Sequence, residues 1–175
     1  NSENVLGRFD GATDVEKTYA LNGDFNSLTI SFDFLEMDSW DAELFGVYIN
    51  DIWISFGSFQ GDTYNDGTRS AGITNSYSYS MTSDAPTDLN GANWDDQVHH
   101  ITLTITNPDI LTADDLTIKF DARTNSGVSD ESYAIDNLKI EADHRKVILV
   151  AQENFDGSTN TARVFDGGVE VAATT

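Results

Sequence analysis

The chain of 175 residues contains no cysteine, only two prolines and only nine lysine or arginine residues. The absence of cysteine excludes a disulfide framework and a thiolate metal site. Thirty acidic residues give a formal net charge of −21. Because no basic stripe is present to neutralise phosphates, the composition argues against nucleic acid and anionic membrane surfaces as partners. The same excess of carboxylates favours the binding of divalent cations. A protein adapted to a saline environment would have a similar composition for reasons of solubility alone.

Long apolar runs are also missing. No stretch reaches the length of a membrane span, and the first residues, NSENVLG, lack a signal-peptide pattern. We therefore expect no membrane insertion and interpret the chain as a mature soluble protein or a monomeric module of a larger one. A cysteine-free, acidic, β-rich module is typical of a bacterial surface or secreted protein. The length is sufficient for one domain with a substantial core.

Alternation of apolar and polar side chains is the dominant pattern, and no segment shows helical periodicity over three turns. The clearest strands span residues 28–34 and 45–49, which we expect to form a central hairpin. Further strand patterns occur at residues 52–56, 77–81, 98–106, 116–120 and 133–140. This number of short strands predicts an all-β sandwich.

The segment between the two halves of the expected hairpin is acidic and aromatic. It contains Asp38, Trp40, Asp41 and Glu43. An indole among mutually repelling carboxylates contributes little to a core. We therefore expect a surface loop in which a cation or a polar ligand relieves the repulsion. A solvated turn is the alternative interpretation.

Two other loops carry oxygen donors and aromatic rings. Residues 57–76 are rich in glycine, asparagine and aspartate, and we expect a long irregular loop there. Its donors are Asp62, Asn65 and Asp66, whose spacing is not that of an EF-hand. A second loop precedes the strand at 98–106 and contains Trp94, Asp95 and Asp96.

Two polar residues fall within apolar strand patterns. His99 shares its strand face with Ile101 and is interpreted as a packed histidine rather than a metal ligand. In the strand at 133–140 the apolar residues change from odd-numbered to even-numbered positions. We therefore expect a bulge near Asp136 and Asn137 that turns the apolar residues on both sides of it inward. If Asp136 is buried, it needs a compensating partner such as a metal ion. A surface position for Asp136 is the alternative.

Two longer segments carry a family resemblance. MDSWDAELFGVYIND at residues 37–51 and SDESYAIDNLKI at residues 129–140 resemble segments of the jelly-roll modules of large RTX-type bacterial adhesins, including their calcium-dependent peptide-binding domains. Related sandwiches occur among carbohydrate-binding modules. The resemblance implies a jelly-roll-like antiparallel β-sandwich in which calcium rigidifies the loops at one end.

The order of the segments differs from that in modules of this kind. There, a segment similar to ENFDGST opens the domain and one similar to LGRFDG follows; here ENFDGST lies at residues 153–159, after LGRFDG at residues 6–11. The chain therefore resembles a permuted or split module. We expect residues 1–175 to form a single domain, with residues 147–175 supplying the opening strand. The strand VILVAQ would pair with NLKIEA across a turn at residues 143–146.

On this basis we expect a noncatalytic, calcium-dependent ligand-binding module on a bacterial cell surface, extracellular, with Ca²⁺ as its cofactor. The candidate calcium ligands are Asp38, Asp41, Glu43, Asp130, Glu131, Asp136, Glu153 and Asp156. The candidate ligand-binding residues are Trp40, Asp41, Tyr64, Trp94, Asp95 and Arg123. The resemblance implies that the ligand is an extended peptide with a free C-terminal carboxylate, displayed on another cell.

Three alternatives remain open at this stage. A carbohydrate-binding module would stack Trp40, Trp94 and Tyr64 on sugar rings. A calcium-rigidified spacer would have no open coordination position. A glycoside hydrolase would use two of the acids, but thirty acids produce chance pairs and none stands out by its surroundings. The chain also has no phosphate loop, nucleophile elbow or HExxH motif.

Overall fold

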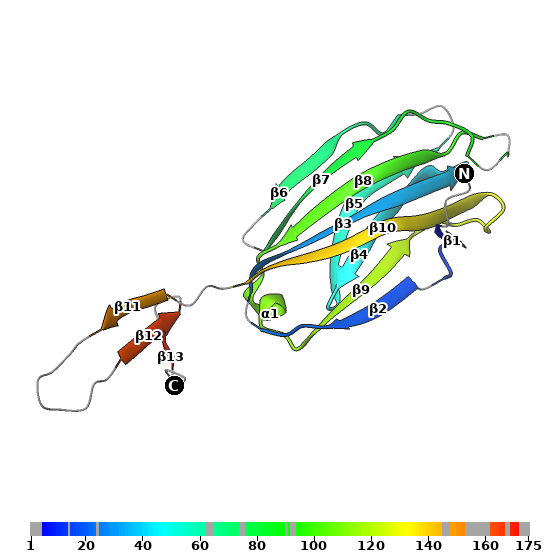
Figure 1. The fold of residues 1–175 in the computed structure, drawn as a ribbon. Coiled ribbons are helices and arrows are strands. Elements are labelled where there is room, and N and C mark those ends of the chain that lie inside the picture. Colours follow the sequence, from blue (N-terminus) through cyan, green and yellow to red (C-terminus); the bar gives the residue numbers. More distant parts are fainter. Residues whose placement is uncertain are drawn as a thin grey trace, which may run out of the picture.

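The fold is an antiparallel β-sandwich, as the sequence predicts (Figure 1). The computed structural model describes residues 5–13, 15–23, 25–61, 65–73, 76–89, 91, 94–144, 148–152, 162–166 and 169–171. Two sheets pack face to face, and the chain crosses between them repeatedly. The only helix among the described residues is α1 (Pro108–Leu111), a single turn at which the side chain of Asn107 accepts a hydrogen bond from the Asp109 N–H.

The larger sheet has six strands in the order β1-β10-β3-β8-β7-β6. Their bounds are Leu6–Phe9 for β1, Phe25–Asp38 for β3, Arg69–Ile73 for β6, Tyr77–Ser83 for β7, Gln97–Ile105 for β8 and Glu131–His144 for β10. The smaller sheet has the order β2-β9-β4-β5. Its strands span Val15–Ala20 for β2, Asp41–Ile49 for β4, Ile52–Gln60 for β5 and Asp115–Ala122 for β9.

The core lies between the inner faces of the two sheets. Along β3 every second residue from Leu28 to Phe34 is buried, as the alternating pattern requires. Phe34 from β3 stacks on Phe45 from β4, with ring centroids 3.8 Å apart and planes 6° apart. Complete burial of such a side chain contributes about 1.5–3 kcal/mol. The facing aromatic rings therefore supply much of the attraction between the sheets.

The expected hairpin between residues 28–34 and 45–49 is wrong. β3 pairs with β8 and β10, whereas β4 pairs with β5 and β9. The two strands therefore lie in different sheets and pack across the sandwich rather than side by side. Ser39 and Trp40 therefore form a corner that carries the chain from one sheet to the other.

The turn after β4 is confirmed. Asn50 and Asp51 both adopt positive φ angles, 44° and 68°, and Ile49 pairs with Ile52 across them. This is the conformation that a two-residue hairpin favours. The prediction of an irregular loop over residues 57–76 is only partly right, because β5 continues to Gln60 and β6 lies within the same range.

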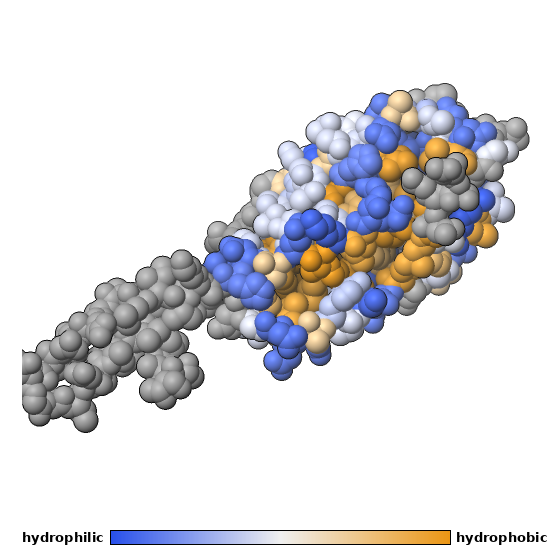
Figure 2. Space-filling model, viewed as in Figure 1, coloured by the Kyte–Doolittle hydropathy of each residue, from blue (hydrophilic) through white to orange (hydrophobic). Residues whose placement is uncertain are grey.

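The bulge in β10 is also confirmed, since the register shifts between Asp136 and Lys139. We expected the bulge to turn the apolar residues on both sides of it inward, and this is only partly the case. Ile135 is buried, but Leu138 is 36% exposed. Beside this part of β10 a groove of about 240 Å³ is lined by apolar residues that include Leu6, Phe120 and Leu138. Figure 2 shows the apolar surface on this side of the sandwich, between β10 and β9.

The C-terminal strands differ from the expected arrangement. β11 (Ile148–Gln152) pairs with β12 (Ala162–Asp166), which pairs with β13 (Val169–Val171). These form a third sheet, so the predicted pairing of VILVAQ with NLKIEA is wrong; NLKIEA lies in β10 beside β3. The placement of ENFDGST beside LGRFDG falls outside the described residues. The division of the chain into domains stays a prediction.

Candidate functional site

Buried carboxylates gather at one end of the sandwich. This end lies where β3 stops and where β4, β8 and β10 begin. Its buried acids are Glu36, Asp38, Glu43, Asp66, Asp96 and Glu131, each no more than 9% exposed. A buried carboxylate is costly unless it is paired, hydrogen-bonded or bound to a metal. The partners of each one therefore indicate what it does.

Two of the six, Asp38 and Asp96, hold neighbouring parts of the chain together. The carboxylate of Asp38 contacts the guanidinium of Arg8 and the hydroxyl of Ser132. Asp96 accepts hydrogen bonds from the backbone N–H groups of Asp38 and Leu89, at 2.9 and 2.8 Å. Asp38, predicted to bind calcium, is thus engaged in an ion pair that holds β1 to the end of β3.

A second group surrounds the corner between β3 and β4. We call Asp41, Glu43, Asp130 and Glu131 the corner cluster. Ser39 binds the backbone oxygen and the carboxylate of Asp130, which joins the corner to the loop before β10. The structure therefore brings together the two acidic segments that the sequence analysis singled out, residues 38–43 and 130–131.

Asn125 bridges the two glutamates of the corner cluster. Its side-chain amide donates to Glu43 at 3.1 Å, and its backbone N–H donates to Glu131 at 3.0 Å. Burial raises the pKa of Glu131, hydrogen bonds from Asn125 and Ser126 oppose this, and the charges of Glu43 and Asp130 raise it further. Within the part of the chain that the structure describes, no lysine, arginine or histidine forms an ion pair with the corner cluster.

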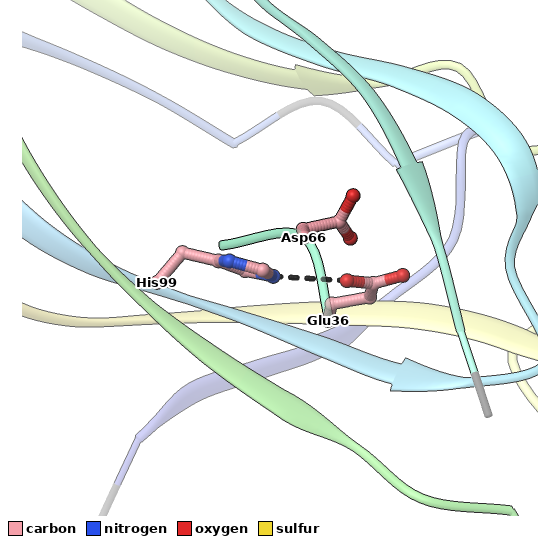
Figure 3. Close-up of side chains that lie close together, drawn as sticks. All are labelled: Glu36, Asp66 and His99. Carbon is pink, nitrogen blue, oxygen red and sulfur yellow. Dashed lines mark hydrogen bonds and ion pairs between the residues drawn. The ribbon is translucent and has the colours of Figure 1, made fainter. Parts of the chain in front are cut away.

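A third group lies deeper and is shown in Figure 3. We call Glu36, Asp66 and His99 the buried triad. Nε2 of His99 lies 2.9 Å from Oε2 of Glu36, and Nδ1 lies 2.7 Å from the hydroxyl of Ser83. Asp66 contacts the guanidinium of Arg69. The ring of His99 is completely buried.

Burial dominates the protonation of the triad. It raises the pKa of Glu36 well above 4.5, and the neighbouring Asp66 carboxylate raises it further, against the opposing charge of Arg69. Burial also lowers the pKa of His99 to about 3. The pKa of Asp66 is raised by burial but held down by the Gln60 N–H and by Arg69. Burial therefore favours the protonated form of Glu36 and the neutral form of His99.

The structure corrects the role expected for Trp40. Its side chain is 1% exposed, packs against Phe34 with centroids 5.5 Å apart, and donates its indole N–H to the Ser132 oxygen at 3.0 Å. A ring buried in this way presents no face to a ligand. Trp40 is a core residue that fixes the corner.

Asp136 is neither buried nor near the corner cluster. It accepts a hydrogen bond from the adjacent Asn137 N–H at 2.7 Å and is half-buried. It lies five positions along β10 from Glu131, which corresponds to about 17 Å. Asp136 therefore cannot share an ion with the corner cluster, and because it is not fully buried, the condition under which we expected it to need a cation is not met.

The remaining predicted residues are dispersed. Trp94 is 44% exposed and Asp95 is half-buried, both before β8. The guanidinium of Arg123 lies over the ring of Trp53, 4.3 Å from its centroid. Tyr64, Glu153 and Asp156 lie outside the described residues.

The sequence analysis did not identify Glu36, although its signal was present. Even-numbered residues of β3 face the core, and this parity continues past Phe34 to Glu36. In β8, His99 shares the inward parity of Ile101 and pairs with Phe34. If the rule that every second residue faces the core is continued beyond the apolar residues, it places Glu36 of β3 and His99 of β8 on the inner face of the sheet. The sequence could therefore have predicted an inward-facing acid near an inward-facing histidine.

Comparisons with known proteins add no assignment: no family model, no curated protein and no solved structure matches the chain. Among the described residues, no helix combines the length and apolar character needed to cross a membrane.

Proposed function

We propose that the protein is a noncatalytic, calcium-dependent ligand-binding module of a bacterial surface adhesin. The supporting observation is the corner cluster, in which acidic residues of two separate segments, joined through Ser39 and Asn125, lie near one another without a basic partner among the described residues. Such an arrangement is favourable when a hard cation lies between the acids. Calcium is suited to it because it takes six to eight oxygen ligands at about 2.3–2.6 Å.

The proposed ion joins the corner to the loop before β10. Glu43 accepts a hydrogen bond from the side-chain amide of Asn125 and Glu131 accepts one from its backbone N–H, while Asp41 is exposed at the rim. The exposed carboxylate of Asp41 makes the rim the natural place for an open coordination position. A ligand oxygen would bind there directly.

The charge of the chain constrains the ligand. A peptide C-terminus is anionic, and a protein of net charge −21 repels it. A bound cation reverses the local field and gives the carboxylate a partner. The resemblance of residues 37–51 and 129–140 to peptide-binding adhesin modules suggests an extracellular peptide with a free C-terminus as the ligand, and the charge of the chain implies that such a peptide binds only when calcium is present.

Calorimetric titration with Ca²⁺ tests the ion site. Glu131→Gln keeps an oxygen that accepts from the Asn125 and Ser126 N–H groups but removes the charge, so calcium affinity should fall by at least about tenfold. Glu141→Gln is the control, because Glu141 is 59% exposed on β10 beside Lys139. Equal calcium affinity in the wild type and Glu131→Gln would refute the site.

A peptide and glycan array, probed with calcium and with chelator, tests the ligand. Asp41→Ala should abolish binding while leaving the fold intact, because its carboxylate is exposed. Binding of C-terminal peptides that survives chelation, or that survives Asp41→Ala, would contradict the proposal.

A second candidate, carbohydrate binding, is supported by a different surface. On the outer face of the smaller sheet, the rings of Tyr48 and Trp53 lie 5.0 Å apart, and Tyr48 lines a hollow of about 170 Å³. Trp53 lies directly over Gly46, where a Cβ would collide with its ring. Aromatic faces with nearby polar groups suit sugar rings. Loss of glycan signals in Trp53→Ala, with peptide signals unchanged, would support this candidate.

A further inference from the structure

We propose that Glu36, Asp66 and His99 bind one metal ion of the zinc class, at a site separate from the corner cluster. The site is independent of the proposed calcium function, which does not require it. It is the only group of three or more histidine and acidic side chains with metal-ligand spacing among the described residues.

The three side chains come from separate elements and converge (Figure 3). Glu36 is on β3, His99 is on β8, and Asp66 precedes β6. One ligand atom from each lies within 4.8 Å of the others, and the Glu36 and His99 atoms are already 2.9 Å apart. Zinc bonds of about 2.0–2.1 Å place tetrahedral ligands about 3.4 Å apart. Small side-chain rotations would therefore close the site.

An oxygen inside the triad has no donor. Oε1 of Glu36 is buried and accepts no hydrogen bond, alone among the buried side-chain polar atoms that the structure describes. Buried polar atoms without a partner are rare and call for an explanation. One carboxylate oxygen of Glu36 lies within 4.8 Å of one of Asp66. Two carboxylates at this distance need either a proton or a cation between them.

The surroundings of His99 leave one nitrogen for an ion. The hydroxyl of Ser83 engages Nδ1 at 2.7 Å, which fixes the ring and directs Nε2 at Glu36. Metal-bound histidines commonly use their second nitrogen in this way. The rings of Phe34 and Phe59 pack against His99, with centroids 5.2 and 4.8 Å away, and exclude water from it.

Both the backbone and the side chain of Asp66 make contacts that fix its position. Its N–H donates to the Gln97 side chain at 3.1 Å, and its carboxylate accepts from the Gln60 N–H at 3.2 Å and contacts Arg69. Each carboxylate oxygen has two lone pairs, so these contacts leave acceptor capacity for an ion.

The donor set selects the class of metal. Calcium and magnesium prefer oxygen ligands only, whereas imidazole suits zinc and its neighbours in the first transition row. One nitrogen and two carboxylates therefore favour Zn²⁺ over the Ca²⁺ proposed for the corner cluster. The chain has no cysteine to compete as a softer ligand.

The test is a calorimetric titration of the chelator-stripped protein with Zn²⁺. The wild type should bind one equivalent tightly, and Glu36→Gln should bind it at least about 100-fold more weakly. Glutamine matches the volume of the protonated acid and can donate to Asp66 while accepting from His99, so the fold should persist. The calcium response of the corner cluster should be unchanged in Glu36→Gln, which separates loss of this site from failure of the proposed function.

A matched control excludes a surface site. His100 is adjacent on β8, 46% exposed, and lies 2.6 Å from Asp33 and 3.4 Å from Asp84. Zinc binding by His100→Gln should equal that of the wild type. Loss of binding in His100→Gln, full binding in Glu36→Gln, or no tight binding by the wild type would each overturn the proposal.

A measurement on the wild type alone covers the case in which Glu36→Gln fails to fold. The chain has three histidines, whose ring nitrogens can be followed by ¹⁵N NMR. One equivalent of Zn²⁺ should shift Nε2 of His99 and leave the other two rings unchanged. A shift confined to His100 or His144 would place the ion elsewhere.

Discussion

Replacement of Glu36 by glutamine should stabilise the metal-free protein, and the gain should increase with pH. The Glu36 side chain faces His99 on β8, Asp66 and Arg69 at the edge of β6, and Glu43 on β4. Burial and the two acids raise its pKa, while only Arg69 lowers it. The native protein therefore keeps Glu36 protonated at a pH at which the unfolded chain ionises it.

The magnitude follows from proton linkage. A carboxyl group with a raised native pKa contributes stability that is complete below its unfolded pKa of 4.5 and is lost as the pH rises towards the native value. Between about pH 5 and the native pKa of Glu36, the wild type should lose about 1.4 kcal/mol per pH unit relative to Glu36→Gln. For a chain of this size, that corresponds to about 3–6 °C in melting temperature per pH unit. His99 is common to both proteins, so its own titration cancels in the difference.

Thermal unfolding in chelator at pH 5, 6, 7 and 8 measures this difference. Glu141→Gln on the exposed end of β10 provides the control and should show no gain that grows with pH. Parallel pH profiles for the wild type and Glu36→Gln would refute the reasoning. A destabilised Glu36→Gln would show that Glu36 is ionised and paired with a charged His99.

Two further predictions follow from the fold. Trp40→Ala should cost about 3–5 kcal/mol, because it removes a buried ring and its hydrogen bond to Ser132; Trp94→Ala, at a ring 44% exposed, should change stability by no more than about 0.5 kcal/mol. Equal urea-unfolding midpoints for the two variants would contradict this. Removal of residues 147–175 should leave the sandwich folded, because the ten strands of its two sheets end at His144. A truncated chain without a cooperative melt by circular dichroism would show that the tail completes the core.

Strand periodicity predicted the sandwich because each inner face repeats every second residue. The pattern at residues 28–34 and 45–49 also located β3 and β4 correctly. It could not say whether these strands pair or face each other, because a hairpin and a crossing between sheets use the same alternation. The distinction depends on which partners β8, β9 and β10 provide, and those lie far along the chain.

The candidate site was predicted only in part, because it too depends on contacts between residues that are distant in the sequence. Local composition identified the acidic segments around Asp41 and Asp130, which the fold brings together. Local composition gave the wrong environment for Trp40, because a tryptophan next to acidic residues can point either to solvent or into the core, and the local sequence is the same in both cases. The pairing of Glu36 with His99 depends on the alignment of β3 with β8 over a separation of 63 residues, which no local pattern specifies.

The most direct test of the central claim is the melting temperature of the protein in chelator and in millimolar Ca²⁺. An ion that binds only the folded state at 100 times its dissociation constant adds about 2.7 kcal/mol, which is about 5–11 °C for a chain of this size. The proposal predicts a rise of this order in the wild type and in Glu141→Gln, and a much smaller rise in Glu131→Gln. Identical melting curves for the wild type with and without calcium would contradict calcium dependence.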